Sequence, residues 1–168
     1  MKSIRHVAVS ALLTIGIFGT VAYTACNKDA CASVTCMNGG TCNGGTCTCP
    51  VGYEGTTCDT KSNAKFVGTY TASESCGGTA SKPYQVIITA DPSDPTKILI
   101  ANLGNYNCTV GGTITFTGNV NATQLTINDN QCGTQMNATG TYSNGAISIN
   151  YTAIYGAITD NCTANLTK

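Results

Sequence analysis

The β character of this chain is clearest in residues 136–151, which read MNATGTYSNGAISINY. Apolar side chains recur at every second position on both sides of Asn144-Gly145, a pair of residues that favours a tight turn. Met136, Ala138 and Tyr142 lie before the turn, and Ile147, Ile149 and Tyr151 lie after it. A period of two around a turn predicts two antiparallel strands, each with one buried face.

The same alternation extends over residues 65–168. It recurs in residues 66–72, 84–90, 114–116, 125–127 and 162–166, and Gly-, Pro-, Asn- or Asp-rich turns separate these runs. Residues 98–103 differ because they are apolar on both faces, which predicts the best-covered strand. No stretch has a helical period. We therefore expect an all-β domain over 65–168, an antiparallel up-and-down barrel or a sandwich of eight or nine short strands.

Eleven cysteines fall into groups of one, six and four. The last group, Cys76, Cys108, Cys132 and Cys162, is spread through the β domain and allows three pairings. Cys76 ends the first expected strand and Cys162 lies in the last, and these strands are neighbours when an antiparallel sheet closes. We therefore predict the disulfides Cys76–Cys162 and Cys108–Cys132.

The group of six occupies residues 31–58 with the spacing Cys-x4-Cys-x5-Cys-x4-Cys-x-Cys-x8-Cys. Together with NGGT at 38–41 and CPVGYEG at 49–55, this spacing resembles an EGF-like domain. Sequence alone leaves fifteen connectivities open. The resemblance implies Cys31–Cys42, Cys36–Cys47 and Cys49–Cys58. The segment has too few apolar residues to fold unaided, and each disulfide contributes about 2–4 kcal/mol.

Metal sites are the alternative interpretation of dense cysteines. Zinc is held by four ligands, commonly in closely spaced cysteine pairs with histidine, whereas exported cysteines form disulfides. Some EGF-like domains bind calcium through acidic residues beside the first cysteine, but Ala30 stands at such a position here. We expect disulfides, no metal and no cofactor.

Residues 1–25 have the pattern of a secretory signal peptide. Lys2 and Arg5 precede residues 7–25, which are uncharged and largely apolar. A retained transmembrane helix is the alternative, because the run is about long enough to span a bilayer. Threonines and glycines within it favour cleavage.

The end of this segment, Tyr23-Thr24-Ala25-Cys26, resembles the lipobox of bacterial lipoproteins. The resemblance implies that Cys26 is lipidated and that residues 26–30 form a tether from a membrane. Asn27-Lys28-Asp29 is similar to the acidic tags that route some Gram-negative lipoproteins to the surface. We expect an exported outer membrane lipoprotein, surface-exposed or periplasmic. The alternative is a eukaryotic secreted adhesion or matrix protein whose six Asn-x-Thr sites carry glycans.

Charge and side-chain chemistry exclude several functions. Beyond residue 25 the chain has six lysines and eight carboxylates, a net charge of −2, and neither arginine nor histidine. This composition excludes a basic footprint for nucleic acid. A nucleophile with its base, or a facing carboxylate pair, is also not evident. Glu74 is the one acid in an inward register, and we expect no enzyme activity unless Glu74 acts in a hydrolase.

We therefore expect a binding or interaction protein. Residues 59–64 are expected to form a linker between its two domains. Residues 66–70, Phe-Val-Gly-Thr-Tyr, resemble the Gly-x-Trp opening of lipocalin-like domains, which implies a carrier of a small apolar ligand. If Phe66, Phe116 and Met136 fill the interior, only surface contacts remain. Aromatic tips that could contact a protein, a glycan or an apolar ligand are those of Tyr84, Tyr106, Tyr142, Tyr151 and Tyr155.

Overall fold

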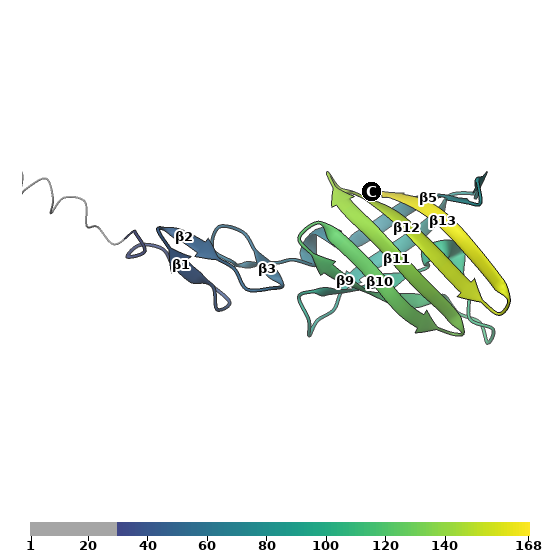
Figure 1. Cartoon of the computed structure of the whole chain (residues 1–168), viewed down its shortest axis with the longest axis horizontal. Coiled ribbons are helices and arrows are strands. Elements are labelled where there is room, and N and C mark those ends of the chain that lie inside the picture. The colour runs from purple at the N-terminus through teal and green to yellow at the C-terminus, as the bar shows by residue number, and fades with distance from the viewer. Residues whose placement is uncertain (1–29) are drawn as a thin grey trace, which may run out of the picture.

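The computed structural model describes residues 30–168, which form a narrow cysteine-rich module and a β-barrel placed end to end (Figure 1). The expected signal peptide and the expected lipid site, Cys26, lie outside the described residues. The elements in chain order are β1 (Thr41–Asn43), β2 (Thr46–Thr48), β3 (Tyr53–Glu54), β4 (Thr60–Lys61), η1 (Ala64–Phe66), β5 (Gly68–Cys76), β6 (Thr79–Ala80), β7 (Tyr84–Ala90), β8 (Lys97–Ala101), η2 (Leu103–Asn105), β9 (Thr115–Asn121), β10 (Gln124–Gln131), β11 (Thr134–Ser143), β12 (Ala146–Tyr155) and β13 (Ile158–Thr167).

The cysteine-rich module, residues 30–61, consists of two small hairpins held by disulfides. Strand β1 pairs with β2 through a turn at Gly44 and Gly45, whose φ angles of 57° and 86° suit glycine. Strand β3 pairs with β4. The three bridges are Cys31–Cys42, Cys36–Cys47 and Cys49–Cys58, and they coincide with the pairs implied by the resemblance to an EGF-like domain. In place of an apolar core, these bridges hold the module together.

The barrel is a closed meander of eight antiparallel strands. Strands β7 to β13 each pair with the next, β5 pairs with β7, and β13 pairs back with β5. The expected fold class is therefore confirmed, and it is the barrel form of the two architectures considered. The short strand β6 adds to β5 outside the ring. Cys76 and Cys162, which are paired across β5 and β13, form a disulfide at this closure.

The interior of the barrel is filled by large apolar side chains. Phe66, Phe116 and Met136 are fully buried, and Tyr70 donates a hydrogen bond of 2.8 Å to the carbonyl of Phe66. Space is short enough that a Cβ atom on inward-facing Gly118 would lie 2.7 Å from Leu125. The interior is thus packed as a protein core and does not resemble the open ligand cavity of a carrier barrel.

The outer surface is polar and mostly uncharged. Outward positions on β10 to β13 are occupied mainly by Asn, Thr, Ser and Gln, with Ala146 and Ile154 as apolar exceptions. In a transmembrane barrel the apolar side chains face outward, whereas on these strands the outward side chains are mostly polar and the apolar ones face inward.

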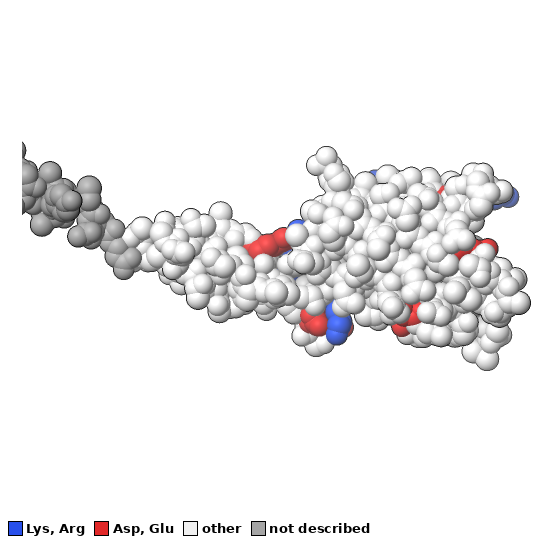
Figure 2. Space-filling view, in the orientation of Figure 1, with Lys and Arg blue, Asp and Glu red and all other residues white. Residues whose placement is uncertain are grey.

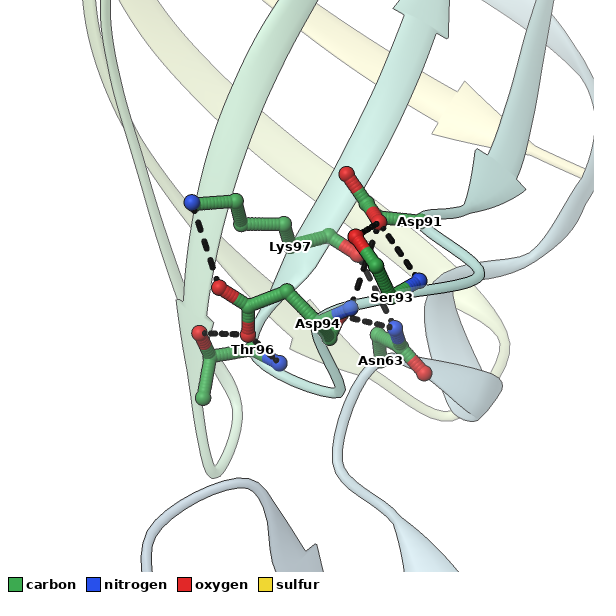
Figure 3. A network of polar contacts seen from close by, with 6 residues as sticks. All are labelled: Asn63, Asp91, Ser93, Asp94, Thr96 and Lys97. Atoms are coloured by element: carbon green, nitrogen blue, oxygen red, sulfur yellow. Dashed lines mark hydrogen bonds and ion pairs between the residues drawn. The ribbon is translucent and has the colours of Figure 1, made fainter.

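The module meets one end of the barrel at Asn63, a fully buried side chain drawn in Figure 3. Its amide Nδ2 donates to the carbonyls of Asp94 (3.1 Å), in the loop between β7 and β8, and of Lys97 (2.9 Å), the first residue of β8. Its backbone N–H donates to Pro95 at 3.1 Å. Residues 59–64, which we expected to be a linker, thus include strand β4 and this buried anchor.

Two further contacts cross the junction. Lys65 and Glu54 form an ion pair of 2.6 Å, and a Cβ atom on Gly52 would lie 2.7 Å from Pro95. The loop itself is ordered by Asp94, which accepts bonds from the Thr96 hydroxyl and N–H and pairs with Lys97. Those bonds lower the pKa of Asp94 to about 2. The module therefore continues directly into one end of the barrel, here called the proximal end.

Candidate functional site

Six polar side chains gather inside the opposite, distal end of the barrel. This distal cluster comprises Glu74 of β5, Tyr84 of β7, Tyr106 after η2, Tyr151 and Tyr155 of β12, and Asp160 of β13. Four of the five tyrosines proposed as binding residues therefore lie together. The fifth, Tyr142, packs on Phe66 at the proximal end, with ring centroids 5.4 Å apart.

Glu74 lies at the buried centre of the distal cluster, with 7 % of its surface exposed. Both Tyr84, at 2.7 Å, and Tyr151 donate hydroxyl hydrogen bonds to its Oε1. The hydroxyl of Tyr84 in turn accepts the N–H of Gly104 at 2.9 Å. Burial, followed by the hydrogen bond to Glu74, raises the pKa of both tyrosines well above the ordinary range of a phenol.

Asp160 forms the outer half of the distal cluster. Tyr106 and Tyr155 donate to its Oδ2 at 3.0 and 2.9 Å, and their rings lie 5.3 Å apart at 56°. Burial raises the pKa of Tyr106 above its ordinary value, and the bond to Asp160 does the same for Tyr155. Asp160 is partly exposed, so this half of the cluster is open to solvent.

The loop after β8 covers the cluster because of one glycine. Gly104 has a φ of 75°, and a Cβ atom there would lie 3.0 Å from the Tyr151 hydroxyl. The same loop is bridged to the β10–β11 turn by Cys108–Cys132. Together with Cys76–Cys162, this second barrel disulfide coincides with the predicted pairing. The two disulfides thus hold the β5–β13 pair on one side of the cluster and the loop after β8 on the other.

The chemistry available to the distal cluster is limited by its own hydrogen bonds. Each carboxylate accepts from two phenols, so its charge is solvated by hydroxyl groups of the protein. Glu74 has the inward position expected from the sequence. The position of Asp160 was not predicted. Tyr155 is its neighbour in the β12–β13 hairpin, but Tyr106 is 54 residues away in sequence and only the barrel fold places it beside Asp160.

A second surface lies on the outside of β10 to β13, and we call it the Asn/Thr face. Asn128, Asn137, Thr152 and Asn161 form one cross-strand row, and Thr126, Thr139, Asn150 and Thr163 form the next. These residues line a shallow depression of about 650 Å³. Figure 2 shows this side of the barrel as a broad uncharged surface with acidic patches near its margins.

Two hydrogen bonds order the Asn/Thr face. The hydroxyl of Thr152 donates to Asn161 Oδ1 at 2.8 Å, and that of Thr163 donates to Asn150 Oδ1 at 3.0 Å. Four of the Asn-x-Thr triplets seen in the sequence begin on β11, β12 and β13, where both residues of a triplet face outward. That spacing was a signal for this surface, but the alternation of a half-buried strand produces the same spacing without any function.

Three general features of the described residues bear on the site. Between residues 30 and 168, no group of three or more His, Cys, Asp or Glu side chains is arranged to hold a metal ion. In the same range, none of the helices is long and apolar enough to cross a membrane. The five disulfides indicate folding in an oxidising, extracytoplasmic compartment.

Comparison with known proteins gives one structural match. The chain matches no protein-family model and no curated protein sequence. Among solved structures, it is similar to a protein of Bacteroides fragilis described as a "putative outer membrane protein", with 22 % identity and a TM-score of 0.42. The match covers 62 % of this chain and spans about half, 51 %, of the other.

Proposed function

We propose that this chain is a non-enzymatic, lipid-anchored binding protein that acts outside the cytoplasm. In this proposal the cysteine-rich module is an EGF-like spacer, and the barrel carries the binding surface at its outer side. The spacing of the six cysteines and the N-terminal segment ending in Cys26 support the proposal. So does the junction at Asn63, which links the module to the proximal end of the barrel.

The observation that carries the proposal is the filled barrel. Twenty-two buried residues form one continuous core, with Phe66, Phe116 and Met136 among its largest members. A carrier of the lipocalin type needs an interior that can enclose its ligand. This packing therefore favours contact through the outer surface over carriage of a small apolar ligand.

The absence of enzyme activity is part of the same proposal. Glu74 accepts two phenol hydrogen bonds in a buried position, and Asp160 accepts two more at the distal rim. Neither arrangement resembles a nucleophile with its base, and the two carboxylates belong to separate phenol pairs. We assign both carboxylates to closure of the distal end.

The anchor is tested by fractionation of cells that produce the full chain or its Cys26→Ser variant. We expect the wild type to enter the detergent phase on Triton X-114 partition and Cys26→Ser to remain in the aqueous phase. Ala32→Ser, a matched substitution beyond the tether, should behave as wild type.

Equal partition of the wild type and Cys26→Ser would contradict the anchor. Asn-linked glycans on a secreted, unacylated wild type would instead support the eukaryotic alternative. Protease added to intact cells distinguishes surface exposure of the barrel from a periplasmic location.

A further inference from the structure

We propose that the Asn/Thr face binds a neutral polysaccharide. The inference rests on the proposed function only in taking the outer surface of the barrel as the binding surface, and it does not depend on the lipid anchor. The argument concerns the geometry, the donors and the charge of eight side chains on four adjacent strands.

The rows of the face present polar groups at regular spacing. Paired residues run continuously from Asn128 through Asn137 and Thr152 to Asn161. Neighbouring strands in a sheet lie about 4.8 Å apart, and side chains on the same face recur about every 6.7 Å along a strand. An extended ligand can therefore meet several amides and hydroxyls at once.

The internal hydrogen bonds orient the amides toward solvent. Because Asn150 and Asn161 accept threonine hydroxyls at Oδ1, their Nδ2 groups are directed away from those threonines. Neither Nδ2 group donates to another described residue. The face thus offers fixed N–H donors beside hydroxyl oxygens, which is the complement of a ligand rich in hydroxyl groups.

The charge of the face excludes most other ligand classes. Its two rows contain neither an acidic nor a basic side chain and present no large apolar group. An anionic or cationic ligand would lose hydration without gaining a counter-charge. The depression is shallow for its volume of about 650 Å³, so a chain laid across it fits better than an enclosed small molecule. A neutral glycan chain meets all three conditions.

The test uses the full chain in a detergent with a polyoxyethylene headgroup, because sugar-headed detergents would compete. Immobilised protein is exposed to dextran, laminarin, mannan and pullulan, with alginate as an anionic comparison, and binding is followed by biolayer interferometry. We expect at least one neutral polysaccharide to bind and alginate not to bind. Repetition along the polymer should raise the apparent affinity.

The decisive variant is Asn150→Asp/Asn161→Asp. It keeps both oxygen acceptors and the side-chain shape but replaces two N–H donors with two charges. Binding should weaken about tenfold or more. The control Gln85→Glu/Asn121→Asp adds the same charge at exposed positions outside the depression and should bind as wild type. Asn128→Ala, which removes one exposed amide, should weaken binding less than the double variant.

Several results would overturn the inference. These are failure of the folded wild type to bind any neutral polysaccharide, unchanged binding by Asn150→Asp/Asn161→Asp, or an equal loss in the control. Formation of dimers that this variant abolishes, seen by sedimentation, would assign the face to a second copy instead. None of these results would alter the partition of Cys26→Ser, so failure of the inference is distinguishable from failure of the anchor. Unchanged thermal melting of each variant verifies folding.

Discussion

At the distal end of the barrel, individual hydrogen bonds determine how the carboxylate of Glu74 can be buried without a cation. Glu74 is buried with Tyr84 and Tyr151 as donors, and no lysine forms an ion pair with it among the described residues. A buried charge is stable only when its lone pairs are satisfied. The two phenol hydroxyls therefore hold the Glu74 carboxylate in place and provide its hydrogen-bond donors.

Glu74→Gln should destabilise the protein by about 1–3 kcal/mol. Glutamine keeps the shape and an oxygen in the place of Oε1, which accepts both phenols. A neutral amide oxygen is a weaker acceptor than a carboxylate oxygen, so both buried hydrogen bonds are weakened. The free energy of unfolding in urea measures the effect. Asp59→Asn, a change at an exposed carboxylate, serves as the control and should change it by less than about 0.5 kcal/mol. An unchanged urea midpoint for Glu74→Gln would contradict the structural role assigned to Glu74 in closing the distal end.

The raised pKa values of the phenols in the distal cluster predict that the protein loses stability in alkali. The pKa values of Tyr84, Tyr106 and Tyr151 are raised in the folded protein, so above pH 10 the unfolded chain loses these protons first. Their contribution is complete below the ordinary phenol pKa and is lost as pH rises toward the folded values. Each phenol should lower the free energy of unfolding by up to about 1.4 kcal/mol per pH unit in that range.

Urea titrations between pH 9 and 11.5, with the disulfides intact, measure this slope. Tyr84→Phe should reduce it, because phenylalanine has no proton to lose. A flat profile for the wild type would show that the cluster does not hold its phenols protonated.

At the scale of elements, the junction determines how the module continues into the barrel. Asn63, on the segment before η1, donates from its side chain to one carbonyl of the β7–β8 loop and to the first carbonyl of β8, and from its backbone N–H to Pro95 in the loop. Gly52 allows close approach of the module to Pro95. The six residues after Cys58 thus act as a fixed connector rather than as flexible chain.

Asn63→Ala should destabilise the barrel by about 1–2 kcal/mol, because the partly buried carbonyls of Asp94 and Lys97 each lose one of their two donors. It should also increase the range of angles between module and barrel. Thermal unfolding measures the first effect, and residual dipolar couplings of the two parts measure the second. Ala64→Ser, an exposed change one residue away, is the control. A variant with wild-type stability and the same couplings would contradict a fixed connector.

Individual strands were readable from the sequence, whereas their closure was not. Alternation around Asn144-Gly145 correctly located β11 and β12, because one face of each strand is buried. Residues 98–103 were expected to form the best-covered strand. Instead β8 ends at Ala101 and Leu99 is only half-buried, because a strand in a closed barrel has solvent on its outer side. Leu103 is buried from a 3-10 turn.

At the scale of the whole molecule, closure depends on contacts between the two ends of the domain. Strand β13 pairs with β5, and Cys76–Cys162 links residues 86 apart in sequence. Local patterning is identical in a barrel and a sandwich, so this pairing could be suggested only by the cysteines. The contact of Asp160 with Tyr106, 54 residues away, likewise depends on the fold of the whole barrel and could not be predicted from local patterning.

Removal of Cys76–Cys162 should therefore affect stability more than removal of Cys108–Cys132. Loop-closure entropy gives about 4.5 kcal/mol for the long loop and about 3.5 kcal/mol for the loop of 24 residues. Paired cysteine-to-alanine variants, compared by urea denaturation, test the order. The reverse order would indicate that the loop over the distal cluster, and not the seam between β5 and β13, limits the stability of the barrel.

The most direct test of the account is the intact mass of the native protein isolated from the membrane fraction, with thiols alkylated before and after reduction. We predict a chain that begins at Cys26 with acyl groups attached, no thiol reactive before reduction, and ten thiols after it. An unacylated chain with Cys26 free or crosslinked, or thiols that react before reduction, would contradict a lipid-anchored protein stapled by five disulfides.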